Sequence, residues 1–226
     1  MSGETFPRPS TIAIDGPVGA GKTSVGRALS KRLNYRFLDT GIMYRALAWL
    51  AMDLGIDVSD EEALGQLAWN TVIRLNDGED GGVIVNDREV REELRRPAVD
   101  RTVSLVAKAP EVRRAMVEQQ RQITERGKIV VVGRDIGTVV LPQADLKVFL
   151  DAPVSERARR RFQEMENRRD GANYKQVLQD LESRDEMDTK RAHSPLYPAA
   201  DAHVVDTEGF DLTQVTEKVL ALMGEG

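Results

Sequence analysis

The chain has 226 residues, of which 41% are hydrophobic, with 37 Asp and Glu against 32 Lys and Arg and no cysteine. This size suits one compact α/β domain with a small insert. The net charge of −5 disfavours general nucleic-acid binding, and the absence of cysteine excludes disulfides and thiolate metal sites. No apolar run is long enough to span a bilayer. We therefore expect a cytoplasmic protein with no nucleic-acid or membrane partner.

The first ten residues contain Pro7 and Pro9 and lack the basic and apolar regions of a signal peptide. We expect residues 1–10 to form a loose leader. A single domain is expected from residue 11 to residue 226.

The segment from Thr11 to Ser24 has the pattern of a buried strand, a glycine-rich loop and a helix start. The loop matches the phosphate-binding pattern G-x-x-x-x-G-K-[ST]. The residues that would hold ATP are Gly16, Pro17, Val18, Gly19, Ala20, Gly21, Lys22, Thr23 and Ser24. Glycines let the backbone approach an anion at a helix N-terminus, Lys22 adds charge for the β- and γ-phosphates, and Thr23 offers a hydroxyl to Mg²⁺. An ordinary glycine-rich turn is the alternative, which the flanking strand and helix disfavour.

Five short apolar runs alternate with helical patterns, which predicts a parallel sheet covered by helices on both faces. The predicted strands are 11–15, 36–39, 129–133, 146–150 and 203–206. The main helices are predicted after the loop and at 40–54, 111–126, 154–168, 174–187 and 212–223. Ligands of such sheets bind beyond the carboxyl ends of the strands, where Asp15, Asp39 and Arg134 are expected.

A different pattern interrupts this alternation. Ser59 and Glu62 have the spacing of a capping box, which predicts a helix over 60–69. Two β-like runs, 71–75 and 83–87, flank a turn-rich segment and predict a hairpin. A helix is predicted over 99–107. We interpret residues from about 60 to 108 as an inserted subdomain.

Several charged groups lie where they could hold phosphates. Arg45 follows a predicted strand end and could bind a phosphate through two bonds, or pair with a neighbouring acid. Arg134 and Asp135 follow a buried strand, where ligand contact is favoured over a purely structural ion-pair network.

Two helices carry the remaining charges. The first has arginines at 157 and 159–161 and predicts a mobile lid over about 154–172, with a solvated surface helix as the alternative. The second contains Arg184 and Asp188 at i, i+4, which also fits an ordinary salt-bridged helix end.

Taken together, these segments resemble the bacterial cytidylate kinases, a branch of the nucleoside monophosphate kinases, from about residue 12 to 222. The motifs are IDGPVGAGKTS (14–24), LDTGIMYRALA (38–48), VGRDIGTVVLPQADLKVFLDA (132–152), SERARRRFQE (155–164) and RDEMDTKRAHSPLYPAADA (184–202). The resemblance implies a monomeric P-loop kinase with a monophosphate-binding insert and a helical lid. It also implies transfer of the ATP γ-phosphoryl group to CMP and dCMP with Mg²⁺.

The resemblance further implies roles for single residues. Catalysis would involve Lys22, Arg134, Arg157, Arg161 and Arg191, of which Arg157 and Arg161 belong to the lid. Arg45, Arg134 and Arg191 would hold the acceptor phosphate. The rest of the acceptor would be bound by Thr40, Tyr44, Ser104, Arg113, Asp135, Arg184 and Asp188, with Ser104, Arg113 and Asp135 at the cytosine and Arg184 and Asp188 at the sugar.

The cytosine assignment agrees with the chemistry of the base. Asp135 can accept a hydrogen bond from N4, and Arg113 can donate to the acceptor side. Uracil reverses this pattern and would leave buried groups unpaired. We therefore predict a preference for CMP over UMP.

One position departs from the family. An acidic residue usually precedes the glycine of the GRD motif and helps to hold the hydration shell of Mg²⁺, whereas this chain has Val132. We consider Asp15, directly before the loop, as the substitute metal contact.

Three other functions match parts of the pattern. A P-loop kinase for another nucleotide or for shikimate would lack a use for the GRD motif and for Ser104 and Arg113. A nucleotide-dependent switch would need an N-K-x-D segment, which the sequence lacks. A non-catalytic P-loop domain would not need Lys22, Thr23 and the acceptor arginines.

Overall fold

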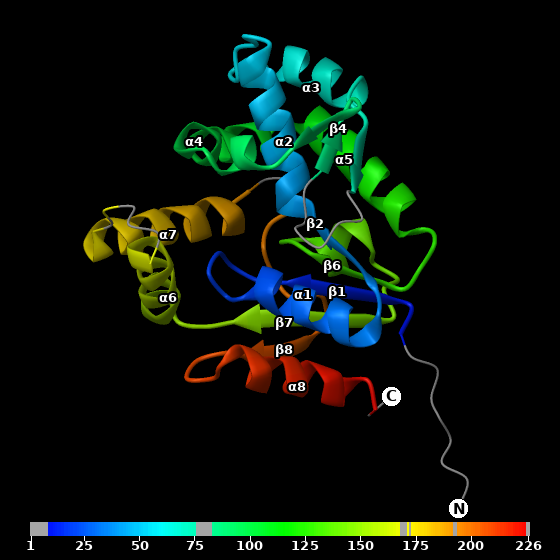
Figure 1. Ribbon diagram of the computed structural model, residues 1–226, viewed down its shortest axis with the longest axis vertical. Coiled ribbons are helices and arrows are strands. Elements are labelled where there is room, and N and C mark those ends of the chain that lie inside the picture. Colours follow the sequence, from blue (N-terminus) through cyan, green and yellow to red (C-terminus); the bar gives the residue numbers. More distant parts are fainter. Residues whose placement is uncertain (1–8, 76–82, 168–170, 172, 192–193, 225–226) are drawn as a thin grey trace, which may run out of the picture. The chain divides into compact units, whose positions relative to one another are not determined.

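The computed structural model describes residues 9–75, 83–167, 171, 173–191 and 194–224. The chain divides into two compact units (Figure 1). The first unit comprises residues 1–37 and 128–226, and the second comprises residues 38–127. The predicted insert lies within the second unit. Most of the predicted leader and the predicted turn at 76–82 lie outside the described residues.

A five-stranded sheet of order β2-β6-β1-β7-β8 forms the centre of the first unit (Figure 1). The strands are β1 (Thr11–Asp15), β2 (Arg36–Asp39), β6 (Ile129–Val132), β7 (Leu146–Asp151) and β8 (His203–Asp206), with the last two residues of β2 in the second unit. β1 pairs in parallel with β6 and β7, so that Ile12 lies opposite Val130 and Leu146. β7 pairs in parallel with β8. All five predicted strands are confirmed, each within one residue of its predicted end.

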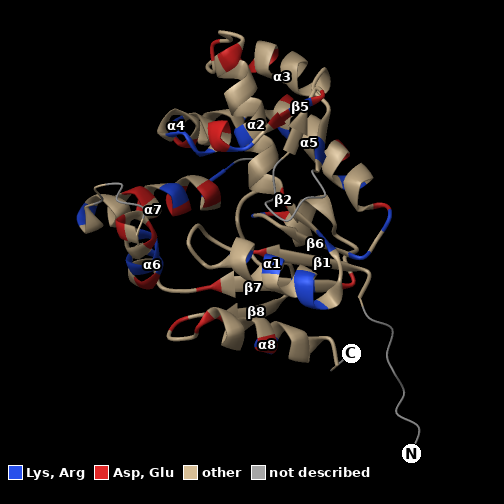
Figure 2. Ribbon diagram, viewed as in Figure 1, with Lys and Arg blue, Asp and Glu red and all other residues tan. Residues whose placement is uncertain are grey.

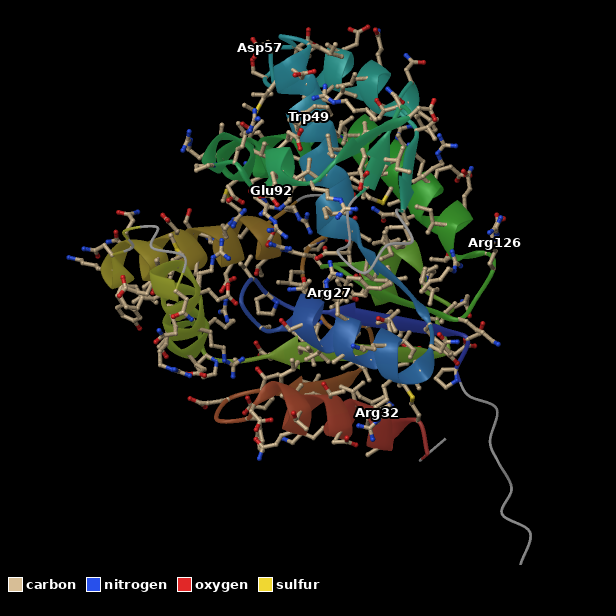
Figure 3. All side chains as sticks on the ribbon, viewed as in Figure 1. Arg27, Arg32, Trp49, Asp57, Glu92 and Arg126 are labelled. Atoms are coloured by element: carbon tan, nitrogen blue, oxygen red, sulfur yellow. The ribbon has the colours of Figure 1, made fainter. Side chains whose placement is uncertain are left out.

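Two helices, α1 (Lys22–Leu33) and α8 (Leu212–Leu222), cover one face of this sheet. Side chains alternate along a strand, so Ile12 and Ile14 point to the same face and meet Leu29 of α1 in a buried core. Arg27 and Arg32 project from α1 in Figure 3, and Arg32 pairs at 2.5 Å with Glu217 of α8. Asp15 directly follows Ile14 on β1, so its side chain points to the opposite face of the sheet.

Two further helices, α6 (Val154–Asn167) and α7 (Tyr174–Thr189), lie side by side in the first unit (Figure 1). They share a small apolar cluster of Ala158, Val177 and Leu181. Both helices were expected from the sequence. A π-helical turn, η2 (Ile136–Val140), follows β6 and was not predicted.

The second unit is mainly helical and holds a small sheet. Its elements are α2 (Thr40–Asp53), α3 (Glu61–Trp69), β3 (Ile73–Leu75), β4 (Val83–Val85), β5 (Arg88–Val90), η1 (Glu92–Arg95), α4 (Pro97–Val106) and α5 (Pro110–Thr124). β3 and β4 pair antiparallel, which confirms the predicted hairpin. β5, an unpredicted third strand, pairs antiparallel with β4.

The predicted capping box of α3 is wrong. Asp60, not Ser59, caps the helix, because its carboxylate accepts a hydrogen bond from the Ala63 amide at 3.0 Å. The Ser59 hydroxyl instead donates to Asp57 at 2.8 Å. Asp is as good a cap as Ser, so the shift by one residue costs the helix nothing.

None of the helices in the described part of the chain combines the length and apolarity that crossing a bilayer requires.

Candidate functional site

The glycine-rich loop connects β1 to the N-terminus of α1 through backbone conformations that favour glycine. Gly16, Gly19 and Gly21 have φ angles of 146°, 81° and 92°. A Cβ atom at Gly16 would lie 2.1 Å from the Leu150 carbonyl oxygen of β7, so no larger residue fits there. The sequence motif and the backbone geometry thus agree on a loop that can wrap an anion.

The charged groups around the loop suit a polyphosphate. The Lys22 ammonium donates to the Pro17 carbonyl at 2.6 Å and therefore lies folded over the loop. Thr23 and Ser24 are exposed in the first turn of α1, and that turn holds no acidic side chain. The positive end of the helix dipole is therefore not offset locally by a carboxylate.

Asp15 fixes the segment that follows β6. Its two carboxylate oxygens accept hydrogen bonds from the amides of Ile136 and Gly137, each at 2.7 Å. These amides open η2, directly after Asp135, which is itself buried. Burial, with a smaller contribution from the nearby charge of Asp135, raises the pKa of Asp15 to about 6 against the opposing effect of the two amides. Asp15 therefore joins β1 to the predicted cytosine-binding segment.

The arginines predicted to bind the acceptor phosphate are held by carboxylates and carbonyls. In the first unit, Arg134 pairs with Asp188 of α7, and Arg191 donates to the Ser194 carbonyl at 2.7 Å. Arg184 is half-buried on α7, one turn before Asp188. The structure thus joins Arg134, predicted for the phosphate, to Asp188, predicted for the sugar.

The second unit carries the other predicted acceptor residues. Arg45 of α2 pairs with Asp100 of α4 and donates to the Leu94 carbonyl at 3.2 Å, so the neighbouring acid anticipated as an alternative is present. The Arg113 guanidinium, on α5, lies 5.8 Å from the centre of the Tyr44 ring. Thr40 is buried at the start of α2, and Ser104 is half-buried on α4.

The two predicted lid arginines differ in their surroundings. Arg161 is partly exposed and pairs with Glu164 of the same helix at 3.1 Å. Arg157 is buried, with only 6% of its side chain exposed, and pairs with Asp185 of α7 at 2.6 Å. Figure 2 shows basic and acidic residues interspersed along α6 and α7. The sequence pattern does not distinguish Asp185 from the exposed acids of α7.

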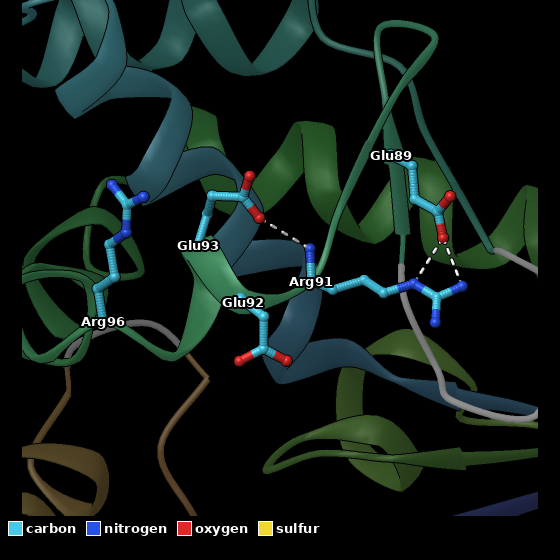
Figure 4. A pocket seen from close by; sticks show the side chains of 5 residues that line it. All are labelled: Glu89, Arg91, Glu92, Glu93 and Arg96. Atoms are coloured by element: carbon cyan, nitrogen blue, oxygen red, sulfur yellow. Dashed lines mark hydrogen bonds and ion pairs between the residues drawn. The ribbon is translucent and has the colours of Figure 1, made fainter.

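A hollow in the second unit lies outside the predicted site (Figure 4). It is lined by Glu89, Arg91, Glu92, Glu93 and Arg96. The Arg91 guanidinium pairs with Glu89 at 2.5 Å, and the Arg91 amide donates to Glu93 at 3.2 Å. The lining mixes acidic and basic side chains, which indicates no particular ligand, so we assign none to the hollow.

A parallel sheet whose first strand enters a G-x-x-x-x-G-K-T loop at a helix N-terminus, with arginines beyond a second strand, defines a P-loop kinase. The chain belongs to the cytidylate kinase family, whose model matches residues 12–225. It is therefore a phosphotransferase enzyme.

Relatives of this family cover nearly the whole chain. The cytidylate kinase of Pelotomaculum thermopropionicum is 45% identical over 95% of this chain and 96% of its own length. The cytidylate kinase of Listeria welshimeri is 44% identical over 93% of this chain and 94% of its own length. Among solved structures, a shikimate kinase from Acinetobacter baumannii in complex with shikimate is 22% identical, with a TM-score of 0.44 over 98% of this chain and 95% of that chain. A likeness at this level does not bear on the substrate.

Proposed function

We propose that the protein transfers the γ-phosphoryl group of ATP to CMP and dCMP, giving CDP and dCDP together with ADP. The observation that carries this proposal is the match to the cytidylate kinase family over residues 12–225. As the family resemblance implies, we propose a monomer that acts in the cytoplasm.

The loop from Gly16 to Ser24 is proposed to hold the phosphates of ATP. Its positive-φ glycines and the start of α1 support this role, since they bring amide groups toward an anion. Lys22 can turn from the Pro17 carbonyl to the β- and γ-phosphates, a short movement of a flexible side chain.

Magnesium fits the oxygen-bearing groups next to the loop. No three His, Cys, Asp or Glu side chains converge anywhere in the described part of the chain. Mg²⁺ is usually held by one or two protein oxygens together with substrate phosphates. Thr23 is proposed as its direct ligand. Asp15 is proposed as an outer contact that replaces the acidic residue which the family usually has at the position of Val132. When bound, the ion would neutralise phosphate charge. Asp15→Asn is then expected to raise the Mg²⁺ requirement more than the KM for CMP.

The acceptor phosphate is proposed to be held by Arg45, Arg134 and Arg191. One of its oxygens forms a bond to the γ-phosphorus while the bond from that phosphorus to the bridging oxygen of ADP breaks. A phosphate oxygen is already ionised, so no side chain has to act as a general base. Catalysis then consists of positioning and of neutralising the spreading negative charge with Lys22 and the arginines.

The rest of the acceptor is proposed to be read by its hydrogen-bonding pattern. Asp135 accepts from the cytosine N4 amino group, and Arg113, with Ser104, donates to the acceptor side of the base. Burial of Arg113 beside Tyr44 supports a fixed guanidinium rather than a mobile one. Thr40 and Tyr44 are proposed to contribute to acceptor binding, and Arg184 and Asp188 to hold the sugar.

Arg161 is proposed as the lid arginine that meets the transferring phosphoryl group. Its ion pair with Glu164 lies within one partly exposed helix, and such pairs are weak enough to exchange. Arg157 is far less available, because protein groups hold its buried guanidinium.

An ADP-release assay with Mg-ATP tests the proposal, comparing CMP, dCMP, UMP, AMP and shikimate with a reaction that lacks an acceptor. We expect turnover with CMP and dCMP that exceeds turnover with UMP by at least about 100-fold in kcat/KM. Equal use of UMP would contradict the roles of Arg113 and Asp135. Turnover with shikimate or AMP instead of CMP would contradict the proposed function itself.

A further inference from the structure

The guanidinium of Arg157 is bound by protein groups on three sides. Its Nε donates to the Ala152 carbonyl at 2.8 Å, and its Nη1 donates to the Val18 carbonyl at 3.0 Å. Nη1 and Nη2 also reach the two oxygens of Asp185, at 3.2 and 2.6 Å. A planar guanidinium with a bidentate carboxylate partner is rigidly held. Arg157 is thus a fixed structural link within the first unit.

The Val18 contact connects this link to the phosphate loop, and two other contacts lie beside it. The Val18 side chain packs against the apolar cluster of α6 and α7. A Cβ atom at Gly19 would lie 3.0 Å from Cβ of Arg157, so the loop backbone passes directly over the start of α6. The Val18–Gly19 part of the loop therefore rests on the α6–α7 pair through a hydrogen bond, an apolar contact and a close backbone approach.

Asp185 supplies the charge that keeps Arg157 in place. It lies three residues before Asp188 on α7, and residues at this spacing share one side of a helix. Asp188 also pairs with an arginine, since one of its oxygens accepts a hydrogen bond from Nε of Arg134. One side of α7 thus fixes an arginine at the phosphate loop and another beyond the end of β6.

We propose that Asp185 is a positioning residue for the donor nucleotide. By fixing Arg157, it sets the position of the Val18 carbonyl and thus of the loop that surrounds the ATP phosphates, although Asp185 itself does not touch ATP. The inference rests on the proposed function only in taking ATP as the ligand of the loop. In this inference, Arg157 fixes the position of the loop and does not contact the transferring phosphoryl group.

A purely structural ion pair is the competing explanation. Removing one partner of a buried pair leaves the other charge unpaired and destabilises a protein, whatever the pair does for function. Replacing both partners with apolar residues of similar size removes that penalty. A double variant therefore separates a loss of stability from a loss of loop position.

The first experiment measures binding of Mg-ATP by calorimetry in the absence of an acceptor. We expect Asp185→Asn to raise the ATP dissociation constant about tenfold or more, and to change the dissociation constant of CMP less. Glu186→Gln is the matched control, because Glu186 is the next residue of α7 and pairs with the exposed Lys190 at 2.6 Å. This control should bind ATP as the unaltered protein does. Unchanged ATP affinity in a folded Asp185→Asn variant would overturn the inference.

The second experiment compares Asp185→Leu with the double variant Arg157→Met, Asp185→Leu. The double variant should recover the thermal stability that the single variant loses, yet still bind ATP about tenfold more weakly than the unaltered protein. Recovery of both stability and ATP affinity would show a purely structural pair and would overturn the inference. If the unaltered protein binds ATP but does not phosphorylate CMP, the proposed function is contradicted, and this comparison still decides the role of Asp185. Failure of the unaltered protein to bind ATP would overturn both the proposed function and the role of Asp185.

Discussion

Arg134 and Asp188, which lie 54 positions apart in the chain, form an ion pair between the segment after β6 and helix α7. The exposed fractions of the two side chains are 27% and 17%, so the pair is largely shielded from water. Shielding strengthens the attraction and limits the movement of the guanidinium. Arg134 is therefore held in a defined position by Asp188, to which the family resemblance gives a role in binding the sugar of the acceptor.

Asp188→Asn should weaken binding of the acceptor. The amide lacks the charge that orients Arg134, so we expect the KM for CMP to rise about tenfold or more. The ATP dissociation constant should stay within about twofold. Steady-state kinetics and calorimetry check the two values, with Asp180→Asn on the exposed side of α7 as the control. An unchanged KM for CMP would show that Asp188 does not act on the acceptor.

Asp15→Asn should alter the pH dependence of stability in the metal-free protein. Because the pKa of Asp15 is raised to about 6, the folded state holds this proton more tightly than the unfolded state does. The resulting stability is fully present below pH ~4 and is lost as the pH rises through about 6, with a total loss of about 3 kcal/mol. An asparagine does not titrate, so the stability of the unaltered protein relative to the variant should decline between pH 4 and 7.

Urea unfolding of both proteins in EDTA at several pH values measures this difference. Titrations of groups far from Asp15 are common to both proteins and cancel in the comparison. Two parallel stability profiles would show that Asp15 does not titrate as the structure predicts.

Gly16→Ala should destabilise the fold more than Gly21→Ala does. Both residues have a positive φ that a residue with a side chain rarely adopts, so both variants are strained by about 1–3 kcal/mol. Only at Gly16 does the added Cβ also meet a backbone atom, the Leu150 oxygen, whereas nothing lies within 4 Å at Gly21. We expect the Gly16 variant to lose about 3 kcal/mol or more of unfolding free energy. Equal losses in chemical denaturation would argue against the close contact between the loop and β7.

Asp135→Asn should narrow the preference for cytosine. An asparagine side chain can turn its amino group toward the O4 acceptor of uracil, which the carboxylate cannot do. The ratio of kcat/KM for CMP to that for UMP should therefore fall by about tenfold or more. A ratio that stays constant while both activities fall would mean that Asp135 acts on the fold of the segment and not on the base.

The sequence predicts the sheet of the first unit well, because each strand has an apolar centre and most end at an acidic residue or before a glycine. It misses β5 and η1, which are short and lack a hydrophobic period of their own. It also misses η2, whose π-helical turn depends on amides bound by Asp15, a residue 121 and 122 positions away. Such elements are determined by tertiary contacts that local patterns do not encode.

Charged residues show the same limit. A run of arginines gives no sign that Arg157 is buried while Arg161, one turn later on α6, remains partly exposed. The ion pairs of Arg157 and Arg134 join segments far apart in the chain, so the spacing that suggests i, i+4 pairs within a helix does not reveal them. The motifs indicate which arginines belong to the site, and the structure shows the carboxylates with which they pair.

Phosphorus NMR of a reaction that contains the protein, Mg-ATP and CMP follows the proposed phosphoryl transfer from donor to acceptor. We expect the resonances of CDP and ADP to grow together in a one-to-one ratio as those of CMP and ATP decline, and Lys22→Met to slow this phosphoryl transfer at least about 100-fold. A CMP resonance that persists unchanged in the presence of folded, ATP-binding protein would rule out the transfer of phosphate to CMP.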